Sequence, residues 1–229
     1  MNILITNDDG IDAPGLAAME SLASRYGTPY TFAPKTEQSG VGHRVTISQQ
    51  LDVIQESEFR YSVDGTPADC VRIAIHAFAL KFGMVLSGIN AGGNLGVDVF
   101  MSGTTAAARE ASYHGIPSFA VSQYHALGSK PDWEKSIELA KRGVDFAKEK
   151  VVQEKGFWNI NLPSIPDASE KAVGVPVRIC RVDRNPHAIG YERNDHGFTY
   201  VGNYQQRPRD PSSDVDLCFG GVLTISYIQ

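Results

Sequence analysis

Short apolar runs alternate with helix-like repeats through the first 150 positions of this 229-residue chain. The first run, at 3–5, is largely β-branched and stops at a polar turn over 7–10, which predicts a buried strand. Apolar residues then recur at helical spacing between Pro14 and Gly27, which suit the start and the end of a helix. Further buried strands are predicted at 30–33, 84–87 and 119–121.

Local signals predict three more helices and one hairpin. A threonine cap followed by proline and then an acid predicts a helix over 66–82. A serine cap opens an alanine-rich helix over 102–114, which a glycine closes. A third helix, over 133–150, has its apolar residues on one face. The segments 45–47 and 61–63 alternate like half-exposed strands, which indicates a hairpin arm.

This order of elements predicts an α/β protein with a parallel, doubly wound sheet. Beyond residue 150 the pattern changes to β-rich pieces separated by Pro and Asp clusters, at 159–162, 173–182, 198–201 and 222–227. No linker sets this part off. We therefore expect one domain over 1–229, made of an α/β core at 1–150 and a β-rich C-terminal extension at 151–229.

Polar residues gather where the first three predicted strands end. They are Asn7, Asp8, Asp9, Ser39, Gly40, Asn90 and Asn94. Because the carboxyl ends of parallel strands share one sheet edge, these side chains are expected to lie close together. Carboxylate, hydroxyl and amide oxygens suit Mg²⁺ or Mn²⁺ and suit zinc or copper poorly. A divalent cation is therefore the expected occupant.

A helix start follows the third loop, at Ser102, Gly103 and Thr104, and its free N–H groups would attract an anion. Each feature also has a plainer explanation, since 7–10 could be only a polar turn and Ser102 only a helix cap. Their coincidence at one edge favours a phosphate-ester site, in which the metal would activate a water. His43 could serve there as a general acid or be a solvated loop histidine.

Composition narrows the possible partners. With 42% hydrophobic and 21% charged residues, the chain has the balance of a soluble globular protein. The net charge of −5 and the lack of a basic run argue against duplex nucleic acid. Neither a signal peptide nor a membrane-spanning stretch is predicted. Cys70, Cys180 and Cys218 lie far apart, which suggests neither disulfides nor a zinc site and favours the reducing cytoplasm.

Several ordered motifs match a known family. They are ILITNDDGIDAPG at 3–15, AP and QSG within 33–40, GTPADCV at 65–71, and SGINAG from 87 through Asp98 and Val99 to SGT at 102–104. Together they resemble the SurE family of survival-protein nucleotidases, from residue 1 to about 122.

The resemblance implies a Rossmann-like core and a metal-dependent phosphatase that acts on nucleoside 5′- and 3′-monophosphates in the cytoplasm, with activity on short polyphosphate as well. It implies homodimers or homotetramers partly built from exchanged segments, in which the extension would take part. It implies one Mg²⁺ or Mn²⁺ ion per subunit, with Asp8 and Asp9 as catalytic residues. The implied metal ligands are Asp8, Asp9, Ser39 and Asn90. The implied phosphate pocket comprises Asn7, Gly40, Asn94, Ser102, Gly103 and Thr104.

Two other hypotheses remain at this point. In one, an aspartate attacks phosphorus directly and forms an aspartyl phosphate. Adjacent acids argue mildly against it, because successive side chains diverge and serve a metal more easily. In the other, the chain is a non-catalytic module that senses a nucleotide or phosphate, which needs the anion pocket but no carboxylate pair.

Overall fold

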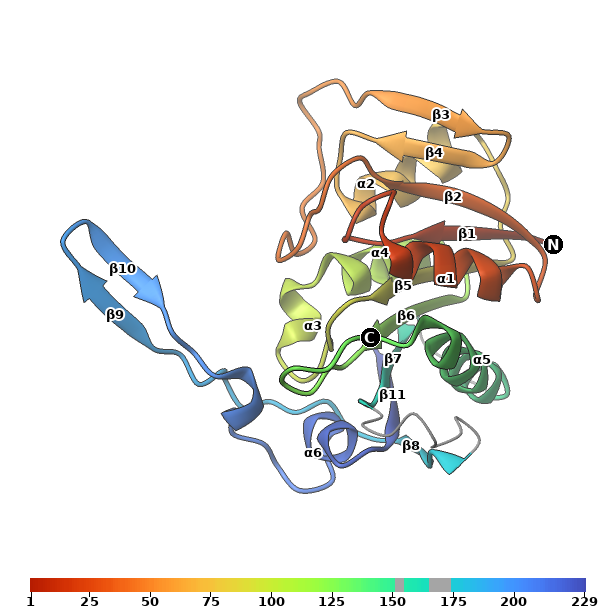
Figure 1. The fold of residues 1–229 in the computed structure, drawn as a ribbon. Helices are drawn as coiled ribbons and strands as arrows, with labels where there is room; N and C mark the ends of the chain where they lie inside the picture. Colours follow the sequence, from red (N-terminus) through yellow and green to blue (C-terminus); the bar gives the residue numbers. More distant parts are fainter. Residues whose placement is uncertain (151–154, 165–173) are drawn as a thin grey trace.

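The computed structural model describes residues 1–150, 155–164 and 174–229 (Figure 1). One nine-stranded sheet has the order β3-β4-β2-β1-β5-β6-β7-β11-β8. Its parallel centre comprises β4 (Arg60–Val63), β2 (Thr28–Pro34), β1 (Asn2–Thr6), β5 (Met84–Asn90), β6 (Ser118–Gln123) and β7 (Phe157–Leu162). At the margins, β3 (Val53–Ser57) and β11 (Leu223–Ile228) run antiparallel to their inner neighbours, and β8 (Val177–Ile179) runs parallel to β11.

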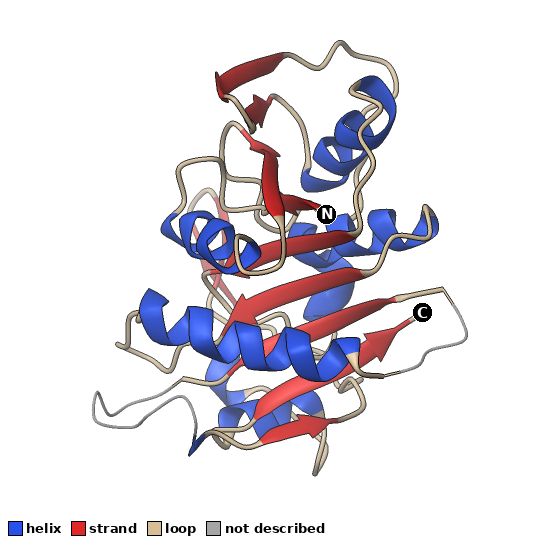
Figure 2. Cartoon of the chain, turned by 90° about the vertical axis from the view of Figure 1, so that its right-hand side faces the viewer, coloured by secondary structure: helices blue, strands red, loops and turns tan. Residues whose placement is uncertain are grey.

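Helices cover both faces of this sheet (Figure 2). The side chains of β1 alternate between the two faces, as the pleat of a strand requires. Ile3 and Ile5 pack in one core with α1 (Pro14–Ala23) and α5 (Trp133–Lys148). Leu4 packs on the opposite face with α2 (Pro67–Arg72) and α4 (Gly103–Tyr113). The predicted α/β class, with a mostly parallel and doubly wound sheet, is thus confirmed.

The chain changes direction across the sheet between β1 and β5. From β1 it moves outward to β2, β4 and β3, and it then returns to place β5 on the other side of β1. Loops after neighbouring strands diverge at such a switch point, which leaves a crevice where open α/β sheets bind ligands. The loops that follow β1, β2 and β5 all lie at this edge.

The C-terminal part extends the same sheet and adds an arm. Strands β7, β11 and β8 continue the sheet, while β9 (Tyr191–Asn194) and β10 (Gly197–Tyr200) form a separate hairpin that projects from the body (Figure 1). At the base of the arm lie the short turn η3 (Tyr204–Gln206) and helix α6 (Asp214–Phe219). In the described parts of the chain, no helix has the length and apolar character needed to cross a bilayer.

Some local predictions were wrong. Residues 45–47 form no strand, and β4 pairs instead with β3, because the amide and hydroxyl of Thr46 bond to Asp69 in α2. The helix that starts at Pro67 widens into a π-helix, η1 (Ile73–Ala77), and ends before residue 82. The short helices α3 (Asp98–Met101) and α6 were missed. Residue 173, at the start of one predicted β piece, lies outside the described residues.

Candidate metal and phosphate site

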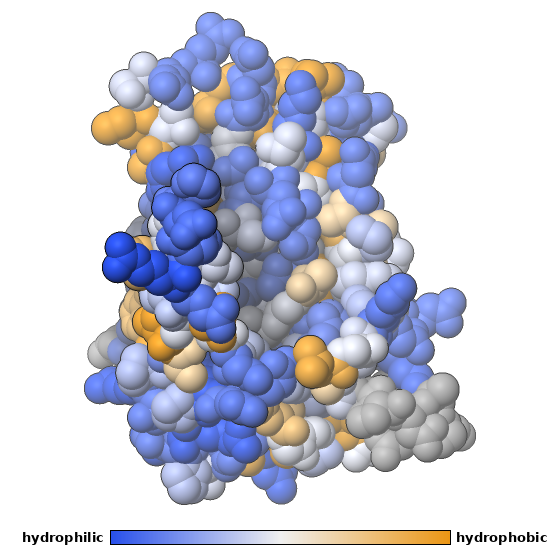
Figure 3. All heavy atoms as spheres, turned by 60° about the vertical axis from the view of Figure 1, so that its left-hand side comes forward, coloured by the Kyte–Doolittle hydropathy of each residue, from blue (hydrophilic) through white to orange (hydrophobic). Residues whose placement is uncertain are grey.

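A cavity of about 210 Å³ opens at the carboxyl edge of the central strands. Its walls are Asp8, Ser39, Gly40, Asn90, Gly93, Asn94, Asp98, Met101, Ser102 and Tyr204. Three separate loops therefore deliver six of the predicted site residues to one place. Figure 3 views this side of the molecule, which is hollowed and largely hydrophilic around the hollow. A larger cavity of about 640 Å³ lies between α3 and the end of β11, but mostly apolar side chains line it.

Asp8 is almost completely buried and is held by the first turn of α4. Its Oδ2 accepts a hydrogen bond of 3.0 Å from the Thr104 amide, and its Oδ1 accepts one from the Thr104 hydroxyl. Burial raises the pKa of Asp8 to about 6, although these hydrogen bonds oppose the shift, and the charge of Asp9 adds to it. The Asp8 carboxylate thus has hydrogen-bond donors but, among the described residues, no positively charged side chain to balance its charge.

Gly103 allows helix α4 to approach Asp8 this closely. A Cβ atom at position 103 would lie 2.9 Å from the Cβ of Asp8 and 3.0 Å from the Cγ of Pro67. Both distances are shorter than side chains tolerate without a shift. Gly103 therefore acts through the position of Asp8, and it is not among the residues that line the cavity.

Asp9 links the loop after β1 to the loop after β5. Its Oδ2 accepts a hydrogen bond of 3.0 Å from the amide of Ala91, the residue that follows Asn90. Burial raises the pKa of Asp9; the Ala91 amide lowers it by less, and the charge of Glu37 raises it further. The Asn90 amide nitrogen donates to the Gly92 carbonyl at 2.8 Å, so that its oxygen remains available as a ligand.

The loop after β2 supplies Ser39 and Gly40. The Gln38 amide donates to the Asp8 carbonyl at 2.7 Å, which joins this loop to the one after β1. The Ser39 hydroxyl donates to Glu37 at 2.8 Å and keeps its oxygen lone pairs for another partner. Gly40 has a φ of +71° and open space beside its α-carbon, so its backbone can come close to a ligand.

Several residues predicted for the phosphate pocket bond to protein groups in this structure. Asn7 is fully buried, and its amide donates to the Gly10 carbonyl at 2.9 Å, which closes the turn after β1. Asn94 lines the cavity, but its side-chain amide nitrogen donates to the Ser122 hydroxyl. The Ser102 hydroxyl caps α4 by accepting from the Thr105 amide. The anion that lies on the Thr104 amide is the carboxylate of Asp8 itself.

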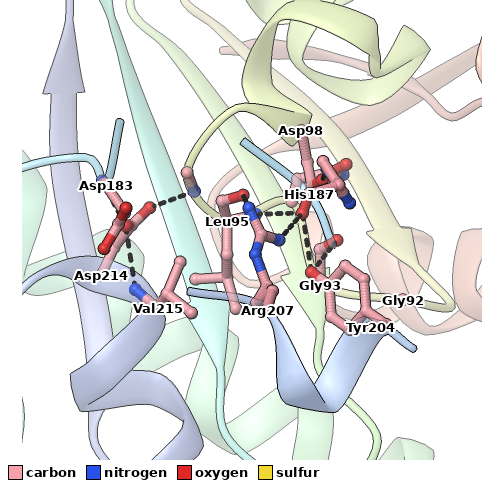
Figure 4. Close-up of polar contacts among 12 residues, drawn as sticks. Gly92, Gly93, Leu95, Asp98, Asp183, His187, Tyr204, Arg207, Asp214 and Val215 are labelled. Atoms are coloured by element: carbon pink, nitrogen blue, oxygen red, sulfur yellow. Dashed lines mark hydrogen bonds and ion pairs between the residues drawn. The ribbon is translucent and has the colours of Figure 1, made fainter. Parts of the chain in front are cut away.

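Four residues of the cavity wall were not predicted: Gly93, Asp98, Met101 and Tyr204. Asp98 and Tyr204 bond to each other (Figure 4). Asp98 Oδ2 accepts from the Tyr204 hydroxyl at 2.7 Å and from Arg207 at 2.8 Å. His187 Nε2 lies 2.6 Å from the other oxygen of Asp98. These contacts fix the base of the arm against the loop after β5. No local pattern could indicate them, because Tyr204 and Asp98 lie 106 positions apart.

A second pair of buried aspartates lies beside this cluster (Figure 4). Asp214 accepts hydrogen bonds from the amides of Gly96, Asp183 and Val215 at 2.7–2.9 Å. Asp183 in turn accepts from two backbone amides and two side chains; these donors are the Asn185 and Asp210 amides, the Asn185 side-chain amide and the Ser213 hydroxyl. Protein donors thus serve both carboxylates.

The donor set at the cavity fits a hard divalent cation. It consists of carboxylate, hydroxyl and amide oxygens, with no lysine, arginine or histidine among the described residues that line the cavity. The raised pKa values of Asp8 and Asp9 indicate negative charge that these residues leave unbalanced. Nowhere in the described ranges, this cavity included, are three His, Cys, Asp or Glu side chains grouped so as to hold a metal, so a cation here would also need the oxygens of Ser39 and Asn90.

Comparison with known proteins shows the family of this chain. The family model for survival protein SurE matches residues 3–188. The chain belongs to the SurE family.

Among SurE relatives, a protein of Nostoc sp. (strain PCC 7120), provisionally named a 5′-nucleotidase, is 40% identical over the full length of both chains. The 5′-nucleotidase SurE of Leptospira biflexa is 36% identical over 100% of this chain and 94% of its own. The crystal structure of the SurE protein from Aquifex aeolicus superposes with a TM-score of 0.86 at 26% identity, covering 100% of this chain and 93% of that one. The SurE fold thus extends over the whole chain.

Proposed function

We propose that this protein is a 5′-nucleotidase that hydrolyses nucleoside 5′- and 3′-monophosphates with the help of one bound Mg²⁺ or Mn²⁺ ion. One observation carries the proposal. At the β1–β5 switch point, Asp8 meets Ser39 and Asn90 around a small polar cavity, the adjacent Asp9 is tied to the loop after β5 through the Ala91 amide, and no described residue that lines the cavity is basic. The names of the SurE relatives give the same reaction class.

The residues that would hold the cation are Asp8, Asp9, Ser39 and Asn90. When bound, such an ion counters the charge of the phosphate and lowers the pKa of a water molecule. The chain itself keeps the ligands in place. Thr104 orients both oxygens of Asp8, and the Ala91 amide orients Asp9. Each carboxylate oxygen still has a lone pair for a further partner.

The phosphate would lie against Gly40, Ser102 and Asn94, which line the cavity together with Asp8. Asn7, Gly103 and Thr104 contribute indirectly in this proposal. Asn7 closes the turn that presents Asp8, while Gly103 and Thr104 bring the start of α4 onto its carboxylate. The fixed geometry of Asp8 favours a ligand role over attack on phosphorus, because hydrogen bonds already hold both of its oxygens.

Phosphate release is the direct test of this function. The purified protein is incubated with AMP, 3′-AMP or p-nitrophenyl phosphate in the presence of Mn²⁺, Mg²⁺ or EDTA. We expect release that requires the metal and that Asp8→Asn abolishes. Tight AMP binding without metal-dependent release would overturn the proposal and favour a nucleotide sensor.

We also propose a homodimer or homotetramer in the cytoplasm. The arm supports the assembly, because it leaves large side chains exposed at Tyr191, Phe198 and Tyr200. Such aromatic surface is typical of protein interfaces. The free thiols of Cys70, Cys180 and Cys218 are compatible with a reducing compartment. Light scattering coupled to gel filtration measures the assembly, and a monomeric mass would contradict it.

A further inference from the structure

The loop that carries Ser39 and Gly40 depends on distant anchors. It spans residues 35–52 between β2 and β3 and contains neither helix nor strand. Loops of this length inside a compact domain are commonly functional. Ser39 itself is exposed and bonds only to Glu37, two residues earlier. The contacts made by the rest of the loop must therefore fix Ser39.

Two groups of anchors lie on either side of His43. Toward the cavity, the Gln38 amide donates to the Asp8 carbonyl at 2.7 Å, and the Gly42 amide donates to the Met101 carbonyl at 2.9 Å, at the end of α3. Farther along, the amide and hydroxyl of Thr46 both donate to Asp69 in α2 at 2.8 Å. Asp69 is buried and belongs to the capping box of that helix, so this second attachment is rigid.

His43 makes its contacts with α4 and does not line the cavity. Its Nε2 lies 2.9 Å from the Glu110 carboxylate, and its Nδ1 lies 3.4 Å from Arg109. Its ring is nearly parallel to that of Tyr113, with 6.0 Å between the centroids. With both ring nitrogens directed at α4, the residue is placed to hold the loop rather than to protonate a leaving group.

Glu110 contacts one side chain from each of three elements. His43 comes from the loop, Arg72 from α2 at 3.6 Å, and His114 from the end of α4 at 3.4 Å. The hydrogen bond from His43 contributes most to lowering the pKa of Glu110, with smaller contributions from His114 and Arg72. The carboxylate therefore remains ionised and can hold His43 at neutral pH.

Helix α4 thus connects to both sides of the cavity. Its first turn holds Asp8 through Thr104, and Glu110 lies six residues later, about 9 Å along the axis. A straight helix between these points keeps the distance between Asp8 and the loop constant. The inference below rests on the proposed function, since it concerns the ligands of that site.

We propose that Glu110, acting through His43, is a positioning residue that holds the 35–52 loop so that Ser39 and Gly40 face Asp8. Glu110 touches neither the cavity nor any group expected to touch the substrate. Its removal would leave every lining residue in the chain but would release the loop between Gly42 and Thr46.

Amide hydrogen exchange in EDTA tests the loop without relying on activity. In Glu110→Ala, we expect the Gly42 amide to exchange about tenfold faster, which corresponds to the loss of about 1.4 kcal/mol of local stability. The Thr46 amide should change less, because Asp69 holds it independently. Glu110→Gln should restore much of the protection, since its amide oxygen can still accept from His43. Unchanged exchange at Gly42 in Glu110→Ala would overturn the proposal.

Glu138→Ala is the matched control. It removes a Glu–Arg contact of 2.7 Å between α5 and Arg25, away from the loop. We expect loop exchange like that of the wild type. Acceleration at Gly42 in this control equal to that in Glu110→Ala would contradict a specific role for Glu110. Thermal melting of each variant checks that the fold persists.

Kinetics with Mn²⁺ and AMP provide the second readout. Glu110→Ala should raise the Mn²⁺ concentration for half-maximal activity and the KM for AMP by about 10-fold or more, as the loss of a residue that orients a metal ligand commonly does. The kcat at saturation should fall less.

A double-mutant cycle with His43→Ala tests the route by which Glu110 acts. If Glu110 acts through His43, the double variant should be no worse than the more impaired single variant. Additive losses would overturn the proposed connection. If the wild type shows no Mn²⁺-dependent release at all, the proposed function fails while the exchange experiment still judges the role of Glu110.

Discussion

Asp8 and Asp183 are both buried carboxylates, yet their surroundings differ in the number of donors they provide. Burial acts to raise the pKa of each. At Asp183, hydrogen bonds from Ser213, Asn185 and Asp210 outweigh burial and lower the pKa to about 2. At Asp8, the two donors of Thr104 do not suffice, and the pKa rises to about 6. A buried carboxylate with ample donors stabilises the fold, whereas one with too few donors has room for a cation.

The largest expected difference concerns turnover. Asp8→Asn should lower kcat for AMP by at least about 10³-fold, because it removes a charged ligand worth several kcal/mol in the transition state. In EDTA at neutral pH its melting temperature should be no lower than that of the wild type, since an amide can still accept from Thr104 and carries no buried charge. Retained metal-dependent turnover would show that Asp8, like Asp183, serves the fold and not catalysis.

The converse substitution should affect stability. Asp183→Ala leaves the buried donors of Ser213 and Asn185 unpaired, which we expect to lower the free energy of unfolding by about 3 kcal/mol or more. The folded fraction should retain kcat. Denaturant unfolding and activity measured at equal folded fraction separate the two effects. A stable but inactive variant would contradict the distinction between the two aspartates.

The pH dependence of stability should have opposite signs at the two sites. The raised pKa of Asp8 gives a stabilising contribution that is present below about pH 4 and is lost as the pH rises through about 6. In EDTA, Asp8→Asn should therefore gain up to about 3 kcal/mol relative to the wild type between pH 4 and pH 7.

Asp183 should show the reverse. Its lowered pKa gives a contribution that is present above about pH 4 and is lost as the pH falls toward 2. Asp183→Asn should thus be most destabilising near neutral pH. Denaturant titrations across this range check both signs, and parallel pH profiles for the two variants would disprove the difference.

A smaller effect is expected from the helix that positions Asp8. Gly103→Ala places a Cβ 2.9 Å from that of Asp8, so the carboxylate must shift. We expect kcat to fall by about tenfold, with modest destabilisation from overpacking. Gly174→Ala is the control, because no atom of the described residues lies within 4 Å of its added Cβ. Equal kinetics for the two variants would show that Gly103 does not position Asp8.

Local signals predicted the elements that begin or end in a short motif. The Thr66–Asp69 capping box and the Ser102 cap are present, because each depends only on residues within one turn. The strand predicted at 45–47 failed because the amide and hydroxyl of Thr46 bond to Asp69, which no period in the sequence reveals. Helix α3, with four residues, is too short for a periodic pattern.

The candidate site was predictable only in part, for the same reason. Strand order at the switch point brings Asp8, Ser39 and Asn90 together. The sequence pattern predicts parallel strands with a shared carboxyl edge, but it does not predict their order. The contact of Thr104 with Asp8 joins residues 96 positions apart. Whether a helix start binds a ligand or a carboxylate of its own chain is decided by tertiary packing.

Calorimetric titration of Mn²⁺ into the EDTA-stripped protein tests the central claim most directly. The wild type and Asp183→Asn should each bind one ion per chain with similar affinity, and Asp8→Asn should lose that binding. Equal Mn²⁺ affinity in Asp8→Asn and the wild type would contradict the assignment of the cation to the edge of β1 and β5.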